Sequence, residues 1–196
     1  IVSKGFVDGF YYKPRVDYEV LAKYHQGVIA LSACLAGEVQ RYLTRGMYEE
    51  AVRAAGRYVD IFGQDNFFLE LQDHGLPDQK LVNQGLMRMS RETGLELVAT
   101  NDIHYTFAED EKAHDILLCI QTGKTIDDEN RMRYEPRNFY LRSEEEMAAL
   151  FAGYEGALEN TSKIADMCNL DFSFGKYHLP EFRLPEGYDS FSYLKK

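Results

Sequence analysis

Asp102 and His104 form the local pattern in this sequence with the clearest chemical potential. Residues at i and i+2 of an extended segment point to the same side, so a carboxylate and an imidazole could reach one ion together. Zinc and manganese both accept such mixed nitrogen and oxygen ligands. A purely structural alternative is that Asp102 is a turn residue at a strand end and that His104 is a satisfied hydrogen-bonding side chain.

Three further polar residues lie close to predicted strand ends: Cys34, Glu70 and His74. A lone cysteine is most often a small buried apolar residue, so Cys34 is a weaker candidate ligand than the Asp102 and His104 pair. Glu70 and His74 are four residues apart and could line the same mouth, or they could order a loop through hydrogen bonds. Cys119 and Cys168 fall in predicted helices and are expected in the core.

The remaining histidines give less chemical signal. His25 lies at a predicted helix end, where a cation is favourable, and is expected to be structural. His114 lies in the middle of a predicted helix and His178 in a predicted connector, and neither has a ligand partner nearby in the sequence.

Short apolar runs predict the strands that position these residues, at 28–32, 66–71 and 95–100. Helical spacing and end signals predict helices at 17–24, 38–45, 47–62, 78–93 and 109–122, with Leu81, Leu86 and Met89 on the buried face of the fourth. This alternation of strands and helices is typical of parallel strands in an α/β sheet or barrel. The carboxyl ends of such strands meet at one rim, where the candidate residues would gather.

The second half of the chain has fewer regular patterns. A polar, turn-rich loop is predicted at 124–138 and a short extended piece at 139–141. Ser143 and Glu146 form a capping-box pattern that opens a helix to about residue 151, and another helix is predicted at 154–167. Residues 175–185 read as an extended connector, and Asp189 or Ser190 would cap a last helix. Because the chain begins at Ile1 and stops within a helix start, we expect it to be a fragment.

The composition is that of an ordinary soluble globular domain: 196 residues, 45% hydrophobic and 28% charged. No apolar run approaches the roughly 20 residues needed to cross a bilayer. Three widely spaced cysteines indicate a reducing compartment, so we expect a cytoplasmic protein. The net charge of −10 argues against a surface that coats nucleic acid. An acidic metal site and a plain solvated acidic surface fit this charge equally well.

Six strings, in order and without a large gap, resemble signatures of the bacterial DNA polymerase III alpha subunit family. They are Leu31-Ser-Ala-Cys-Leu-Ala-Gly-Glu38, Leu69-Glu-Leu-Gln-Asp-His-Gly75, Ala99-Thr-Asn-Asp-Ile-His-Tyr105, Ile120-Gln-Thr-Gly-Lys-Thr125, Phe139-Tyr-Leu-Arg-Ser-Glu-Glu-Glu-Met147 and Gly175-Lys-Tyr-His-Leu-Pro180. One such string would be weak evidence, but six in series are specific. They indicate the C-terminal half of a PHP (polymerase and histidinol phosphatase) domain.

The resemblance implies a fold and a set of site residues. We expect a partial, distorted (β/α)7 barrel with parallel strands, followed by a helical segment leading to the polymerase palm. The PHP portion would span residues 1–175, without its N-terminal strands, and 176–196 would connect to the palm. Cys34, Asp102 and His104 match metal ligands of the family, whereas Glu70 and His74 match a signature without an assigned ligand role. The family's opening His-x-His motif and its next ligands would lie upstream.

The resemblance also implies an activity and partners for the parent protein. It would be a DNA-directed DNA polymerase acting on primer-template DNA and dNTPs, with magnesium in the palm and zinc or manganese in the PHP site. A sliding clamp, a clamp loader and an exonuclease subunit would be its partners. The PHP region would be a metal-dependent phosphoesterase, for example a 3′→5′ proofreading exonuclease, and the isolated fragment would be inactive. An alternative is a catalytically silent scaffold that docks a separate exonuclease subunit.

Overall fold

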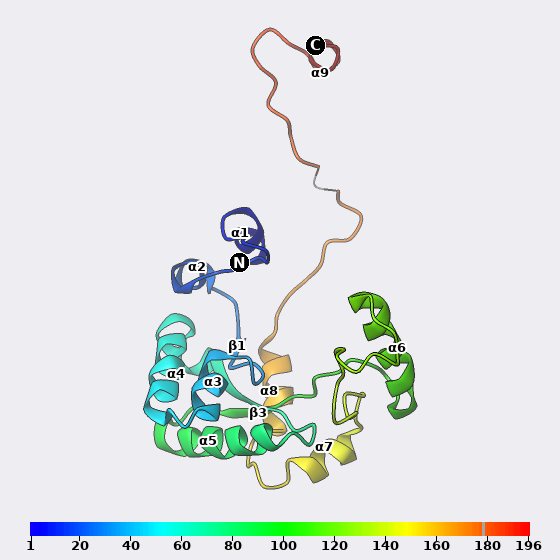
Figure 1. Ribbon diagram of the computed structural model, residues 1–196. Coiled ribbons are helices and arrows are strands. Elements are labelled where there is room, and N and C mark those ends of the chain that lie inside the picture. Colours follow the sequence, from blue (N-terminus) through cyan, green and yellow to red (C-terminus); the bar gives the residue numbers. More distant parts are fainter. Residues whose placement is uncertain (178) are drawn as a thin grey trace.

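A three-stranded parallel sheet forms the centre of the computed structural model, which describes residues 1–177 and 179–196 (Figure 1). The strands β1 (Ala30–Leu31), β2 (Phe67–Leu71) and β3 (Leu97–Ala99) lie in the order β1-β2-β3. Ala30 is paired with Phe67, and Leu69 with Leu97. The predicted parallel α/β sheet is confirmed, although the first and third strands are shorter than the apolar runs suggested. Ala33 has φ 72°, which turns the chain away soon after β1.

Three helices cover one face of this sheet: α3 (Glu38–Thr44), α4 (Tyr48–Phe62) and α5 (Pro77–Thr93). Their apolar side chains meet the alternate β2 residues Phe67, Leu69 and Leu71 in one buried core. Gly94, with φ 74°, ends α5 in the left-handed conformation, as its position after the last periodic residue predicted.

The prediction for the buried face of α5 was partly wrong. Leu86 and Met89 are fully buried, but Leu81 is 53% exposed. The adjacent Val82 takes the inward position instead and is 2% exposed. One residue is about a quarter of a helical turn, so the true apolar stripe is rotated by that amount from the one expected.

The outer edge of β3 is occupied by the segment that opens α8 (Glu159–Met167). The Ala99 amide donates to the Ala157 carbonyl at 2.8 Å, and Asn160 Nδ2 donates to the Leu97 carbonyl at 2.7 Å. The Lys163 ammonium of α8 lies 5.8 Å from the Phe68 ring, on the sheet face opposite the core helices. The helix predicted at 154–167 therefore begins later, because the preceding residues form turns against the strand edge.

Two short helices precede the sheet: α1 (Val2–Val7) and α2 (Tyr18–Tyr24). Asp17 caps α2 as predicted, accepting a hydrogen bond from the Val20 amide at 2.9 Å. Polar contacts attach α2 to the core helices, since Tyr18 donates to Glu38, which also accepts from Arg57 at 2.6 Å. The burial of Glu38 opposes a lower pKa, but its hydrogen bonds with Tyr18 and the charge of Arg57 prevail and lower it.

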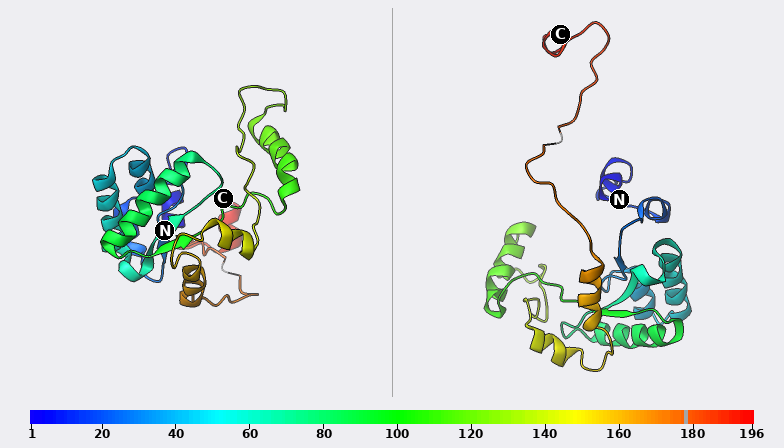
Figure 2. Two further views of the ribbon diagram at one scale, coloured as in Figure 1. Left: turned by 90° about the horizontal axis from the view of Figure 1, so that it is seen from below. Right: turned by 180° about the vertical axis from the view of Figure 1, so that it is seen from behind.

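A separate unit, the outer arm (residues 101–142), projects beside the sheet (Figures 1 and 2). It consists of the loop after β3, a 3-10 turn (Ala108–Asp110), α6 (Glu111–Thr122) and the predicted polar loop that follows. Arg131 closes that loop onto α6 through a paired contact with Asp115, in which Nη2 donates to Oδ2 at 2.7 Å. The two side chains are only 3% and 13% exposed, respectively, so the ion pair is shielded from solvent.

The remaining helices are α7 (Glu144–Leu150) and α9 (Ser190–Leu194). The capping box of Ser143 and Glu146 and the Asp189 cap are confirmed. Between α8 and α9 the described residues form an extended tail that leaves the body of the molecule (Figures 1 and 2). His178, and with it part of the predicted connector, lies outside the described residues.

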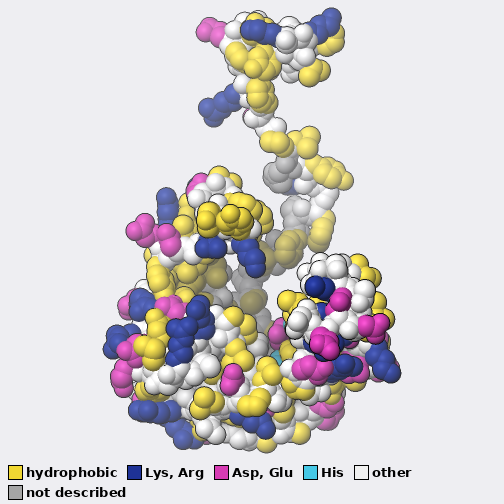
Figure 3. All heavy atoms as spheres, in the orientation of Figure 1, with side chains coloured by type: hydrophobic (Ala, Val, Ile, Leu, Met, Phe, Trp, Pro, Cys, Tyr) yellow, Lys and Arg dark blue, Asp and Glu magenta, His cyan; other side chains and the backbone are white. Residues whose placement is uncertain are grey.

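The tail and the N-terminal region carry many exposed apolar side chains, which gather there in the space-filling view (Figure 3). Phe174 and Tyr177, for example, are both 90% exposed. Cys168 is also exposed, because α8 ends beside it and the tail begins; the prediction that it belongs to the core was wrong. None of the described helices combines the length and the apolar character that a membrane crossing requires.

Candidate functional site

Asp102 and His104 follow the carboxyl end of β3, where a parallel sheet commonly places functional side chains. His104 Nδ1 lies 3.7 Å from Asp102 Oδ1 and 3.2 Å from the Asp102 carbonyl oxygen. Their side chains are 25% and 41% exposed, respectively. Because Nδ1 of the His104 ring faces Asp102, the other ring nitrogen, Nε2, points away from Asp102. The structure thus brings an imidazole and a carboxylate together at a partly open rim.

Aromatic rings from the outer arm surround the imidazole of His104. Its ring centroid lies 4.4 Å from that of Tyr134, 5.3 Å from that of Phe139 and 5.7 Å from that of His114. Tyr134 also contacts Phe139 and His114, at 5.0 Å and 5.2 Å. Burial lowers the pKa of His114, and the neighbouring His104 lowers it further. We call Tyr134, Phe139 and His114 the ring cage of His104.

Backbone hydrogen bonds fix the two sides of this cage relative to one another. The His104 and Tyr105 amides both donate to the Phe139 carbonyl, at 2.8 Å and 3.3 Å. The Phe139 amide donates in turn to the Tyr105 hydroxyl at 3.1 Å, and Tyr140 forms a parallel bridge with Tyr105. The extended piece predicted at 139–141 is therefore present as this short strand-like pairing.

His74 supports the Phe139 ring of the cage. Its ring stacks on Phe139 with centroids 4.5 Å apart and planes 9° apart, and the residue is fully buried. Gln79 contacts both its amide and Nδ1, whereas Nε2 is buried without a hydrogen-bond partner among the described residues. Burial lowers the pKa of His74, and the nearby charge of Arg142 adds to that effect. His74 therefore lies beneath the site and does not line an open mouth.

Glu70 contacts a different set of side chains from His74. Its Oε1 accepts hydrogen bonds from the Thr100 hydroxyl at 2.5 Å and from Gln72 Nε2 at 3.1 Å. It shares a small hollow with Cys34 and Gln40, beside the loop after β1. Glu70 thus accompanies Cys34, and Gln79, which contacts His74, lines the same hollow; a mouth common to Glu70 and His74 stays a prediction.

Cys34 is exposed in the loop that follows β1, two strands away from Asp102 and His104. Within residues 1–177 and 179–196, no three His, Cys, Asp or Glu side chains are close enough together to hold a metal ion. Asp102 and His104 fit a divalent ion as two donors of suitable chemistry, but Cys34 does not join them in this arrangement. The ligand assignment of the three residues stays a prediction.

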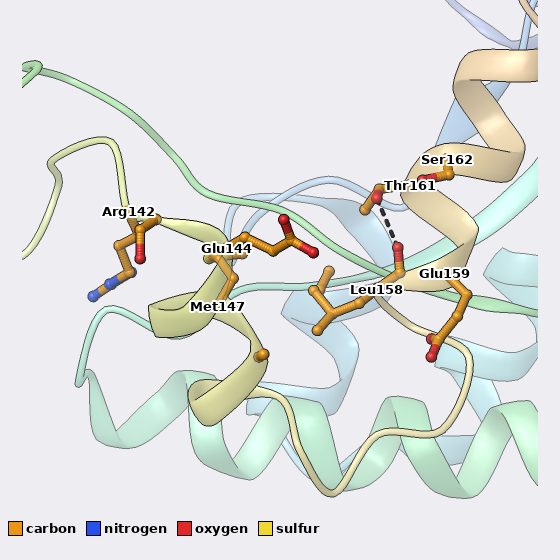
Figure 4. Close-up of a pocket in the computed structure, with 10 residues that line it drawn as sticks. Arg142, Glu144, Met147, Leu158, Glu159, Thr161 and Ser162 are labelled. Atoms are coloured by element: carbon orange, nitrogen blue, oxygen red, sulfur yellow. Dashed lines mark hydrogen bonds between the residues drawn. The ribbon is translucent and has the colours of Figure 1, made fainter.

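A separate hollow of about 630 Å³ lies between α7 and α8 (Figure 4). Glu144, Met147, Leu158 and Thr161 line it, and Thr161 donates to the Leu158 carbonyl at 2.6 Å. Arg142 borders this hollow, but its side chain points away from α8 in Figure 4 and donates to the Asp73 carbonyl at 3.1 Å. No candidate ligand from the sequence lies here.

Sequence reasoning missed the ring cage. His114 was dismissed because it has no ligand partner nearby in the chain, yet it contacts His104 across ten positions. Tyr134 lies in a segment read only as a polar loop. The available signal was the string that begins at Phe139, which marked this stretch without showing what it touches.

Comparison with known proteins shows what this chain is similar to. Residues 1–74 match the family profile described as PHP domain. DNA polymerase III subunit alpha of Treponema pallidum is 44% identical over 188 residues, which cover 96% of this chain and 16% of that protein. The same subunit of Thermus aquaticus is 42% identical over 202 residues, covering 100% of this chain and 16% of that protein. The subunit of Deinococcus radiodurans is 44% identical over 191 residues, which cover 94% of this chain and 14% of that protein.

This chain is therefore homologous, over nearly its whole length, to one segment of bacterial DNA polymerase III subunit alpha, and it carries PHP-domain sequence. It spans about a sixth of the length of the relatives it matches. The PHP match reaches from α1 to the turn after β2 and stops before Asp102. The boundary predicted at residue 175 stays a prediction.

Proposed function

We propose that this chain is part of a DNA-directed DNA polymerase and contributes one side of a divalent-metal centre that hydrolyses phosphodiesters. The similarity to DNA polymerase III subunit alpha over nearly the whole chain supports the first part. The observation that carries the second is the contact between Asp102 and His104 at the carboxyl edge of a parallel sheet. A carboxylate and an imidazole are ligands that zinc and manganese accept.

In this proposal the sheet is part of a distorted (β/α)7 barrel, whose remaining strands would add beside β1. Asp102 and His104 would hold the ion together, and Cys34, which does not join them in this structure, would have to approach from the loop after β1. Such an ion, when bound, supplies a Lewis acid that lowers the pKa of water and polarises a phosphodiester. Glu70, held by Thr100 and Gln72, lines the same rim without a ligand role.

The polymerase reaction itself would take place in another part of the parent protein. Primer-template DNA and dNTPs are its substrates, and magnesium in the palm assists the transfer. A sliding clamp, a clamp loader and an exonuclease subunit are the proposed partners. We expect the 196-residue chain alone to have neither activity, because it would hold only a minority of each site.

Metal analysis of the longer polymerase tests the hydrolytic centre. Asp102→Ala and His104→Ala should each lower the zinc or manganese retained after dialysis, as measured by elemental analysis. His25→Ala is a matched control, because His25 lies at the end of α2 and contacts the Ala22 carbonyl. Unchanged metal content in both Asp102→Ala and His104→Ala would refute the ligand assignment.

A scaffold is the second candidate, and one observation favours it. On α6 the side chains of Ile116, Leu117 and Ile120 are 53%, 60% and 72% exposed, so they form an unpartnered apolar stripe. Such a stripe fits a helix that docks another protein surface, including an exonuclease subunit. Retained proofreading in the Asp102→Ala polymerase, together with loss of exonuclease-subunit binding in Ile116→Asp, would favour the scaffold over the metal centre.

A further inference from the structure

The imidazole of His104 is held by groups that no ligand assignment includes. Among the described residues, Asp102 is its only carboxylate neighbour. Asp102 Oδ1 lies 3.7 Å from His104 Nδ1, which is a loose contact. The closest ring is that of Tyr134, at 4.4 Å between centroids and inclined by 51°. A histidine that must present one ring nitrogen to a ligand needs its orientation fixed by what packs around it.

Tyr134 can serve this purpose only if the polar loop that carries it is itself anchored. Arg131, three residues earlier, provides the anchor: both of its terminal nitrogens donate to the Asp115 carboxylate, and Nε donates to the Ile126 carbonyl at 3.3 Å. A paired arginine–carboxylate contact of this kind is directional as well as strong. It therefore fixes the loop on α6 in one orientation.

The same anchor acts on the second ring of the cage. Asp115 is the next residue after His114 on α6, and His114 contacts both His104 and Tyr134. One ion pair thus holds together the helix that carries His114 and the loop that carries Tyr134. The imidazole of His104 lies where these two elements meet.

We infer that Tyr134 and the Asp115–Arg131 ion pair are positioning residues, which fix the orientation of the His104 ring through the outer arm. The inference deepens the proposed metal centre and rests on it for its functional meaning. The orientation of the ring can nevertheless be measured without any metal, so the two ideas can fail separately.

Nuclear magnetic resonance of the metal-free 196-residue chain tests the orientation. Tyr134→Leu and Arg131→Met should each shift the imidazole carbon and nitrogen resonances of His104, which His104→Gln identifies. Tyr134→Phe keeps the ring and should restore the parent resonances. Tyr177→Leu and Arg53→Met are matched controls, because Tyr177 is 90% exposed and Arg53 pairs with Glu50 on α4, outside the outer arm.

The backbone amides of β2 and α5 show whether each variant is folded. Unchanged His104 resonances in a folded Tyr134→Leu chain would overturn the inference, as would equal shifts in the control variants. If Arg131→Met does not fold, Arg131→Lys keeps the charge but loses the paired geometry, and it should shift the same His104 resonances.

Zinc titration of the longer polymerase connects positioning with binding. Removal of a residue that orients a metal ligand commonly weakens affinity by 10- to 100-fold, so we expect Tyr134→Leu to bind zinc about 10-fold more weakly. Tyr134→Phe should retain the parent affinity. Equal zinc affinity in Tyr134→Leu and the parent would overturn the functional part of the inference. Absence of zinc binding in the parent, with His104 shifts still present, would instead refute the proposed metal centre alone.

Discussion

Two parts of the molecule are stabilised in different ways: the sheet with its three core helices, and the outer arm. The first buries apolar side chains such as Leu69, Leu86 and Met89 completely. The second exposes most of the apolar side chains of α6 and depends on the Asp115–Arg131 pair and on contacts between rings. Apolar burial is insensitive to direction, whereas an ion pair and ring contacts depend on geometry. We call the sheet with its three core helices the stable half. It supports the outer arm, and the outer arm presents His104.

The largest effect should come from a cavity in the stable half. Leu86→Ala removes a fully buried side chain and should lower the free energy of unfolding by about 2–5 kcal/mol. Leu81→Ala, on the same helix but 53% exposed, should change it by less than about 0.5 kcal/mol. Urea unfolding followed by circular dichroism measures both. Similar losses in the two variants would contradict the assigned orientation of α5.

A smaller effect should appear at the junction of the two halves, where His74 stacks on Phe139. Its pKa is lowered from the ordinary 6.5 by burial, so the unfolded chain takes up the proton more readily than the folded chain. The resulting stabilisation is complete above the ordinary pKa and is lost as the pH falls below it. Each unit of pKa difference corresponds to about 1.4 kcal/mol.

His74→Phe keeps a ring on Phe139 but removes this titration. Its free energy of unfolding should therefore fall by less than that of the parent between about pH 7 and pH 5. Urea unfolding at several pH values measures the slope, with His25→Ala as the control. A parent and His74→Phe with identical pH dependence would show that His74 does not titrate abnormally.

The smallest effect concerns α7, which follows the outer arm. Ser143 accepts from the Glu146 amide at 3.3 Å, and Glu146 accepts from the Ser143 amide at 2.8 Å. Ser143→Ala should cost about 1 kcal/mol of stability. Amide hydrogen exchange should show the loss in the first turn of α7 and leave α5 unchanged. Protection lost equally in both helices would mean that the two halves unfold as one unit.

The sequence predicted the helices and loops of both parts well but not the contacts within the outer arm, for a physical reason. Periodic apolar residues and glycine stops such as Gly63 and Gly94 are local signals, and α4 and α5 end where those signals lie. Contacts such as Tyr134 with His104 join residues 30 positions apart and leave no periodic trace. Spacing did identify Asp102 and His104 as neighbours, since two residues on one extended segment need no tertiary information.

The attachment of Ala157 and Asn160 to β3 gives the sheet a single direction of growth. Backbone groups on that side already have partners, so a further strand has no free ladder to join there. On the other side, the only neighbour of β1 among the described residues is β2. Any strand that extends the sheet, whether from the same polypeptide or from another molecule, must therefore align with Ala30 and Leu31. The register of the enlarged sheet would be set by a template only two residues long.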